Sequence, residues 1–214
     1  MKKITYCCVC VVCLLVGSGC GEKVLQKTSQ LADESSIAHE SPQFSQNAKM
    51  FRESCAVGNS VDCYKLGVMY AKGDGKAKWY SKATQFYKIA CESGVLKACN
   101  NLGALYEEGL GIRQSYQVAF RFYQAACSRG EPDACNNLAR MTENGILVSK
   151  DASYAATLYE KACIGGSAVA CLNTGRMYLY GKGVDKNKQS AKSFFGQACD
   201  LSLQEGCEAY KSLL

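Results

Sequence analysis

Ten of the fifteen cysteines form five evenly spaced pairs, and thiols at regular spacing can form disulfides, bind a metal ion or act as a redox dithiol. The cysteines of a pair are eight residues apart, and each pair follows the preceding one by 36 residues. This spacing is unlike that of zinc ligands, and the sequence has a single histidine, His39. We therefore predict disulfides, with no metal ion and no cofactor. The pairs are Cys55–Cys63, Cys91–Cys99, Cys127–Cys135, Cys163–Cys171 and Cys199–Cys207.

The seven residues between paired cysteines match the length of a corner between two antiparallel helices. Such a corner would bring the two cysteines to the Cα separation of about 5–6 Å that a disulfide needs. A rival pairing would join Cys63 to Cys91 within one hairpin. It would leave Cys55 and Cys207 without partners, whereas the array begins and ends on complete pairs. We favour the local pairing.

Other catalytic chemistry has little support in the sequence. His39 lies in a polar segment that precedes the repeats, so a histidine base is not available to the repeats. The serine β-lactamase motifs Ser-x-x-Lys, Ser-Asp-Asn and Lys-Thr-Gly do not occur. The Gly-x-Gly stretches follow predicted helices rather than strands, which is unlike a phosphate-binding loop. We assign no catalytic residue.

The first 42 residues have the features of an export signal and a tether. Lys2 and Lys3 precede an apolar run from 4 to 16 and the small residues Gly-Ser-Gly, which predicts a signal peptide over 1–19. Cys20 then resembles the lipidated cysteine of a bacterial lipoprotein, and it is the one cysteine left after the leader and the pairs are counted. Residues 20–42 are polar and predict a tether. Simple secretion is the alternative.

Export indicates an oxidising environment in which disulfides persist. We expect the protein in the bacterial cell envelope, held to the membrane only through the lipid at Cys20, or released from the cell. The net charge of +6 falls to +4 once Lys2 and Lys3 are removed with the leader, since 23 basic then face 19 acidic residues. Because this excess is small and mixed in sign, we expect no nucleic-acid partner.

The cysteines are placed by two recurring helical patterns. Ala-x-x-Phe-Tyr-x-x-Ala-Cys at 119–127 precedes the first cysteine of a pair, and Cys-x-x-Leu-Gly-x-x-Tyr at 99–106 begins at the second. Both spacings place the apolar residues on one face of a helix. A Gly-x-Gly turn follows the helix that begins at the second cysteine of a pair. The third repeat departs from the pattern, with Ala139 for the glycine, Thr142 for the tyrosine and Leu147 for the second turn glycine.

These patterns predict an all-α solenoid over residues 43–214. It contains a lone first helix, four helix hairpins and a closing helix that begins near Glu205, ten helices in all. Each hairpin buries its apolar stripe only against its neighbours, so the array is stable as a stack. The repeats are expected at about 63–98, 99–134, 135–170 and 171–206.

The string LGALYEEGLG at 102–111, with the helix that follows it, resembles the Sel1-like repeat, a relative of the tetratricopeptide repeat. With a Cys-x7-Cys pair in every unit, the chain is similar to the secreted cysteine-rich Sel1-repeat family first described in Helicobacter. This resemblance implies a repeat scaffold that contacts other proteins. It also implies the alternative function, a weak penicillin-binding β-lactamase that hydrolyses the β-lactam ring.

A binding groove is expected on the concave face. Positions two and five residues after the second cysteine of a pair point away from the apolar stripe, and in solenoids of this kind they line the concave face. Their amides suit an extended peptide or protein segment or a peptidoglycan-like fragment. The family resemblance implies a β-lactam as a further ligand. The alternative is that they stabilise helix starts or lie in solvent. The predicted groove residues are Asn101, Asn137, Arg140, Asn173 and Arg176.

Overall fold

The computed structural model describes residues 41–73 and 78–214, so the predicted signal peptide at 1–19, Cys20 and most of the tether lie outside the described residues. The described residues form ten helices and no strand, which confirms the all-α prediction. The helices are α2 (Pro42–Ala56), α3 (Ser60–Lys72), α4 (Tyr80–Glu92), α5 (Leu96–Glu108), α6 (Tyr116–Ser128), α7 (Pro132–Asn144), α8 (Ala152–Ile164), α9 (Ala168–Tyr180), α10 (Lys188–Asp200) and α11 (Gln204–Lys211).

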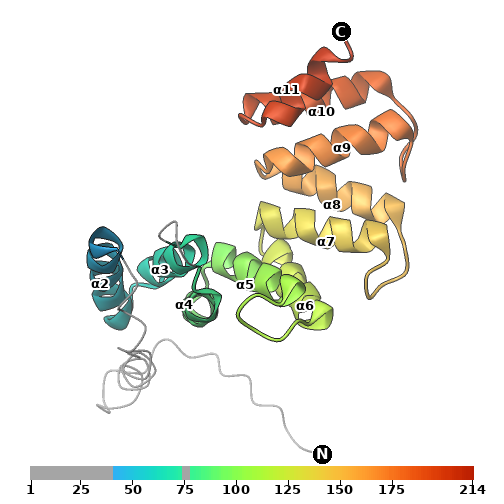
Figure 1. The fold of residues 1–214 in the computed structure, drawn as a ribbon. Coiled ribbons are helices and arrows are strands. Elements are labelled where there is room, and N and C mark those ends of the chain that lie inside the picture. The colour runs from blue at the N-terminus through green and yellow to red at the C-terminus, as the bar shows by residue number, and fades with distance from the viewer. Residues whose placement is uncertain (1–40, 74–77) are drawn as a thin grey trace, which may run out of the picture.

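The helices stack in chain order as the predicted solenoid (Figure 1). Four hairpins, α3–α4, α5–α6, α7–α8 and α9–α10, lie between the first helix α2 and the closing helix α11. In Figure 1 the stack runs from α2 to α6 along the lower part of the view and then rises through α7 to α11. The odd-numbered helices from α3 to α11 also contact one another in succession. Helices on the inner side of a curved stack lie closest together, so these helices line the concave face.

Recurring aromatic pairs hold the two helices of a hairpin together. In three hairpins a tyrosine near the end of the first helix stacks on a phenylalanine of the second, with ring centroids 5.6 to 5.8 Å apart. The helices approach closely because the first carries a glycine: at Gly103 a Cβ atom would lie 2.8 Å from the ring of Tyr123. The stacked pairs are Tyr70–Phe86, Tyr106–Phe122 and Tyr178–Phe194.

The disulfides join the end of each hairpin to the start of the next, as predicted. In all five the partners are eight residues apart in sequence, and their Cα atoms are 4.4 to 4.8 Å apart. Each crosslink closes a short corner, and most of the cysteines are buried in the core. The corner length therefore explains the spacing of the cysteines.

The third hairpin keeps the fold although its sequence departs from the repeat. Thr142 replaces the stacking tyrosine and donates its hydroxyl to the Leu138 carbonyl in its own helix, at 2.9 Å. Leu147 replaces a turn glycine, yet its backbone keeps the left-handed conformation, with φ of 67°. Its side chain is 56% exposed. A hollow of about 270 Å³ lies between Leu147 and α6.

Glu131, at the start of α7, carries a buried carboxyl group. It is only 5% exposed, and among the described residues its Oε1 atom has no hydrogen-bond partner. Burial raises the pKa of Glu131, the nearby Asp133 carboxylate raises it further, and Lys97 opposes the shift. At pH values between the ordinary pKa of a carboxyl group and the raised one, the folded chain therefore holds a proton that the unfolded chain has already lost. Folding becomes less favourable as the pH rises from the ordinary carboxyl range through the raised pKa.

We predict that Glu131→Gln raises the free energy of unfolding at pH 8 by about 1 kcal/mol. A neutral amide then replaces a buried carboxylate whose Oε1 atom has no hydrogen-bond partner among the described residues. The gain should be smaller at pH 4, where wild-type Glu131 is protonated in both states. Urea unfolding at the two pH values measures the difference. Glu53→Gln, on the exposed side of α2, is the control. Equal pH profiles for wild type and Glu131→Gln would contradict the prediction.

Candidate functional site

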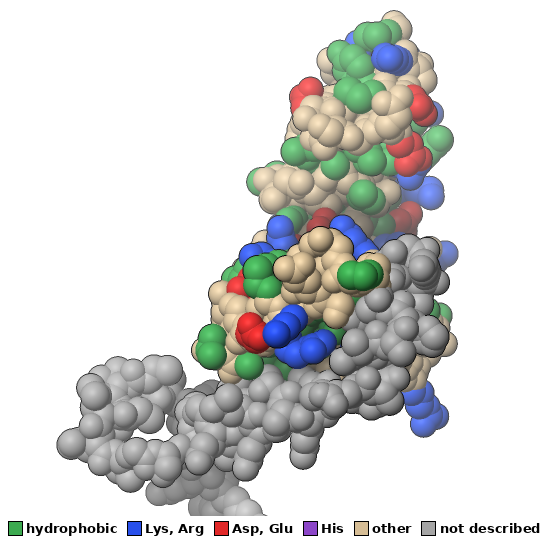
Figure 2. All heavy atoms as spheres, turned by 60° about the vertical axis from the view of Figure 1, so that its left-hand side comes forward, with side chains coloured by type: hydrophobic (Ala, Val, Ile, Leu, Met, Phe, Trp, Pro, Cys, Tyr) green, Lys and Arg blue, Asp and Glu red, His purple; other side chains and the backbone are tan. Residues whose placement is uncertain are grey.

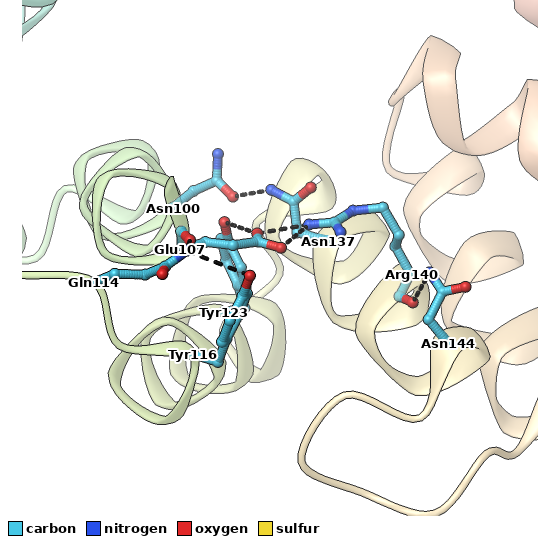
Figure 3. Close-up of polar contacts among 8 residues, drawn as sticks. All are labelled: Asn100, Glu107, Gln114, Tyr116, Tyr123, Asn137, Arg140 and Asn144. Atoms are coloured by element: carbon cyan, nitrogen blue, oxygen red, sulfur yellow. Dashed lines mark hydrogen bonds and ion pairs between the residues drawn. The ribbon is translucent and has the colours of Figure 1, made fainter. Parts of the chain in front are cut away.

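The concave face contains a hollow where α5, α7 and the start of α6 meet (Figure 3). Its volume is about 590 Å³. Two of the predicted groove residues, Asn137 and Arg140, line it. The lining residues, which define what we call the α5–α7 hollow, are Ala104, Glu107, Glu108, Gln114, Tyr116, Tyr123, Asn137 and Arg140.

A charged network joins two repeats at the bottom of this hollow. Nη2 of Arg140, on α7, donates to both carboxylate oxygens of Glu107, on α5, at 2.6 Å each. The Tyr123 hydroxyl donates to Oε2 of Glu107 at 3.0 Å. Glu107 is the more buried partner, with 13% of its side chain exposed against 38% for Arg140. Arg140 therefore crosslinks neighbouring repeats, and little of its charge is left for a ligand.

The surroundings shift the pKa values of these groups in a consistent way. Burial raises the pKa of Tyr123, and the charge and hydrogen bond of Glu107 raise it further. Burial works against the charge of Arg140, but the hydrogen bond and charge of Glu107 raise the pKa of Arg140 overall. Tyr123 therefore stays a neutral donor and Arg140 stays a cation across the physiological pH range.

Amide pairs link the concave helices above the ion pair. Nδ2 of Asn137 donates to Oδ1 of Asn100 in the preceding repeat, at 2.9 Å. One repeat further on, Nδ2 of Asn173 donates to Oδ1 of Asn136 at 3.0 Å. The predicted groove asparagines thus take part in contacts between repeats, and each bonds an asparagine that the sequence analysis did not single out. The Asn-Asn dipeptides at 100–101 and 136–137 are the sequence signal for these pairs.

Each amide pair keeps hydrogen-bonding capacity. An asparagine has two N–H donors and a carbonyl with two lone pairs. Asn137 uses one donor, and none of the described residues donates to its Oδ1. In Figure 3 this oxygen and the Asn100 amide nitrogen lie on the side of the pair away from Glu107. The Asn100 nitrogen makes only a long contact of 3.4 Å with Asn101 Oδ1. The pair therefore presents one acceptor and one donor side by side.

The remaining predicted residues lie at either side of the hollow. Asn101, on α5, hydrogen-bonds the Tyr87 hydroxyl, whose pKa burial raises to about 12 while this bond lowers it. Arg176, on α9, pairs with Glu205 on α11. The two predicted arginines therefore bond in opposite directions along the solenoid, since Arg140 reaches back to α5 and Arg176 forward to α11.

Part of the network recurs one repeat later. The Tyr159 hydroxyl donates to Oε2 of Glu143 at 3.0 Å, as Tyr123 does to Glu107. The cation beside Glu143 is Lys182, at 3.6 Å. Glu107 and Glu143 are 36 residues apart, as are Tyr123 and Tyr159. The repeat period of the sequence therefore indicates that the tyrosine–glutamate pair recurs. The pairing of each carboxylate with a cation from a later repeat could not be deduced from the period.

The surface of the described residues is mixed in charge on at least one side of the solenoid. On the face shown in Figure 2, Lys and Arg side chains lie among acidic and apolar side chains. This face therefore carries no single long-range field of one sign. Among the described helices, none combines the length and apolar content of a membrane-spanning segment. No group of three or more His, Cys, Asp or Glu side chains in the described part of the chain is placed to hold a metal ion.

The Sel1 repeat family model matches four consecutive segments, residues 60–95, 96–131, 132–167 and 168–203. Among solved structures, Helicobacter pylori cysteine rich protein B is 33% identical, with a TM-score of 0.51, covering 64% of this chain and 98% of that one. A Sel1 repeat protein from Oxalobacter formigenes is 23% identical with a TM-score of 0.68, covering 85% and 71% respectively.

A protective antigen of uropathogenic Escherichia coli strains that displays an SLR fold is 21% identical, with a TM-score of 0.67. The match covers 91% of this chain but only 41% of the length of that protein. Likenesses at this level of identity show the fold alone. No curated protein sequence matches the chain. Five disulfides in the described residues are typical of proteins outside the cytoplasm.

Proposed function

The chain belongs to the Sel1 repeat family, and from this premise we propose that it is an extracytoplasmic scaffold that binds an extended peptide segment of a protein partner along its concave face. The observation that carries this proposal is the pair of Asn100 and Asn137, which presents one donor and one acceptor beside the α5–α7 hollow. An extended peptide backbone offers the complementary acceptor and donor, while its side chains enter pockets. The Asn136–Asn173 pair offers the same groups one repeat later.

The disulfide crosslinks support such a role. A peptide bound across several repeats needs a groove whose curvature does not change, because ordering a flexible receptor would reduce the affinity. The five corner disulfides and the Arg140–Glu107 ion pair each hold one repeat against the next. The groove is therefore preorganised before a ligand arrives.

A display library of random linear peptides, selected on the purified oxidised full-length protein, tests the proposal. The double variant Asn100→Ala/Asn137→Ala should bind the selected peptides at least about tenfold more weakly, because two hydrogen bonds to the backbone are lost. Arg129→Ala, at an exposed corner that does not line the hollow, should bind them as wild type does. Thermal unfolding of the double variant separates lost binding from lost structure. Peptides that bind the folded double variant as tightly as wild type would refute the groove.

We further propose that Cys20 carries a lipid anchor that holds the scaffold on the bacterial envelope. Cys20→Ser is expected to move most of the protein from the membrane fraction to the soluble fraction, because the polar tether has no other apolar anchor. Mass spectrometry of the N-terminal peptide provides the direct readout. An unmodified wild-type N-terminus would favour simple secretion instead.

A further inference from the structure

We propose that the peptide bound in the groove carries a basic side chain, Lys or Arg, which enters the α5–α7 hollow and lies between Glu108 and the ring of Tyr116. This inference rests on the proposed peptide-binding function and specifies the ligand that the same site selects. It follows from the charges, the aromatic ring and the room that the hollow provides.

The hollow has an excess of negative charge. Two carboxylates, Glu107 and Glu108, line it against one guanidinium, Arg140. The charge of Arg140 is already matched, because its Nη2 atom donates to both oxygens of Glu107. Glu108 is exposed at the end of α5, and no ion pair or hydrogen bond from another described side chain reaches its carboxylate. An incoming cation would therefore meet an uncompensated carboxylate.

The ring of Tyr116 offers the second contact. Tyr116 is 42% exposed, which is uncommon for a large aromatic side chain in this protein. Nε2 of Gln114 contacts the Tyr116 hydroxyl at 3.3 Å and donates to the Glu107 carbonyl at 2.8 Å. The hydroxyl is thus held near α5, while the exposed part of the ring lines the hollow and can contact a cation. Lysine and arginine bind the faces of aromatic rings favourably.

The other classes of side chain fit less well. An acidic side chain would face two carboxylates and a cation that is already paired. An apolar side chain would desolvate polar groups on nearly every wall, since Ala104 is the one aliphatic residue among those lining the hollow. At about 590 Å³, the hollow has room for a long basic side chain together with water.

The site would also determine the register of the peptide. The repeat positions that match Glu108 hold Lys72, Asn144 and Tyr180, and those that match Tyr116 hold Tyr80, Ala152 and Lys188. A carboxylate and an aromatic ring therefore occur together at one repeat only. A basic side chain would anchor the peptide there, and the amide pairs on α5, α7 and α9 would bind the backbone that leads away from it.

Three pools of fluorescein-labelled heptapeptides test the inference. Six positions are random among uncharged residues, and the centre is Lys, norleucine or Glu. Fluorescence anisotropy measures their binding to the oxidised full-length protein at low salt. The Lys pool should bind about tenfold more tightly than the norleucine pool, since an ion pair and a cation–π contact each contribute modestly. The Glu pool should bind most weakly.

Variants assign the effect to the two residues. Glu108→Gln and Tyr116→Ala should each remove most of the preference for Lys, whereas Tyr116→Phe, which keeps the ring, should retain it. Glu53→Gln, on α2, is the matched control for the loss of one negative charge. Equal binding of the Lys and norleucine pools to wild type would overturn this inference and leave the peptide groove standing. Failure of every pool to bind would instead overturn the proposed function, and this inference with it.

Discussion

Reduction of all five disulfides is expected to unfold the solenoid at room temperature. Each disulfide closes a loop of nine residues, counted from one cysteine to its partner eight positions later. The chain-entropy relation assigns about 2.5 kcal/mol to such a loop. Five loops together contribute on the order of 12 kcal/mol, within the range of about 5–15 kcal/mol typical of the whole stability of a domain. A thin stack, in which each hairpin contacts only its neighbours, has little core to compensate for the loss.

Circular dichroism of the reduced and alkylated protein measures this effect, with mass spectrometry to verify that the cysteines are blocked. The helical signal should be largely lost and the cooperative thermal transition should disappear. Cys127→Ala/Cys135→Ala, which removes one central disulfide, is the graded control. This double variant should lower the free energy of unfolding by about 2.5 kcal/mol and leave the protein folded. A fully alkylated protein that melts within a few degrees of the oxidised one would contradict the prediction.

Gly183→Ala is expected to be, with Gly111→Ala, among the most damaging small substitutions in the turns between paired helices. The backbone of Gly183 is left-handed, with φ of 70°, and a Cβ atom there would lie 2.2 Å from the backbone of Ala152 at the start of α8. A left-handed alanine costs about 1–2 kcal/mol. Overpacking against rigid backbone adds about 1–3 kcal/mol. We expect Gly183→Ala to lower the free energy of unfolding by about 3 kcal/mol or more, which would be seen as a fall in Tm of roughly 6–12 °C.

Leu147→Ala is the matched control, because Leu147 occupies the equivalent turn position 36 residues earlier. It has the same left-handed backbone but faces a hollow of about 270 Å³, whereas Gly183 abuts the start of α8 in the preceding hairpin. The left-handed strain is already present at Leu147 in wild type, so Leu147→Ala leaves it unchanged, whereas Gly183→Ala adds both the strain and the close approach. The control should change stability by no more than about 0.5 kcal/mol. Leu147→Gly compared with Leu147→Ala measures the backbone strain by itself, and a loss at Gly183 no larger than that difference would show that backbone strain, and not packing, requires the glycine.

The sequence alone determined the architecture of the described region. A period of 36 residues, with apolar positions at helical spacing, leaves a stack of helix hairpins as the way to bury every stripe. The same period located the disulfides, because a crosslink eight residues long depends only on the local geometry of a corner. Contacts between residues close in sequence can be deduced in this way, since the chain itself limits their separation.

Tertiary structure decided the groove. The period predicted Asn137 and Arg140 as groove residues, but it could not show that their partners are Asn100 and Glu107. These contacts span 37 and 33 residues and depend on how one hairpin is rotated against the next. That rotation depends on close contacts between hairpins, such as the contact of the turn at Gly183 with the start of α8. Local spacing therefore specified the helices and their disulfides, and packing over longer distances specified which side chains meet on the concave face.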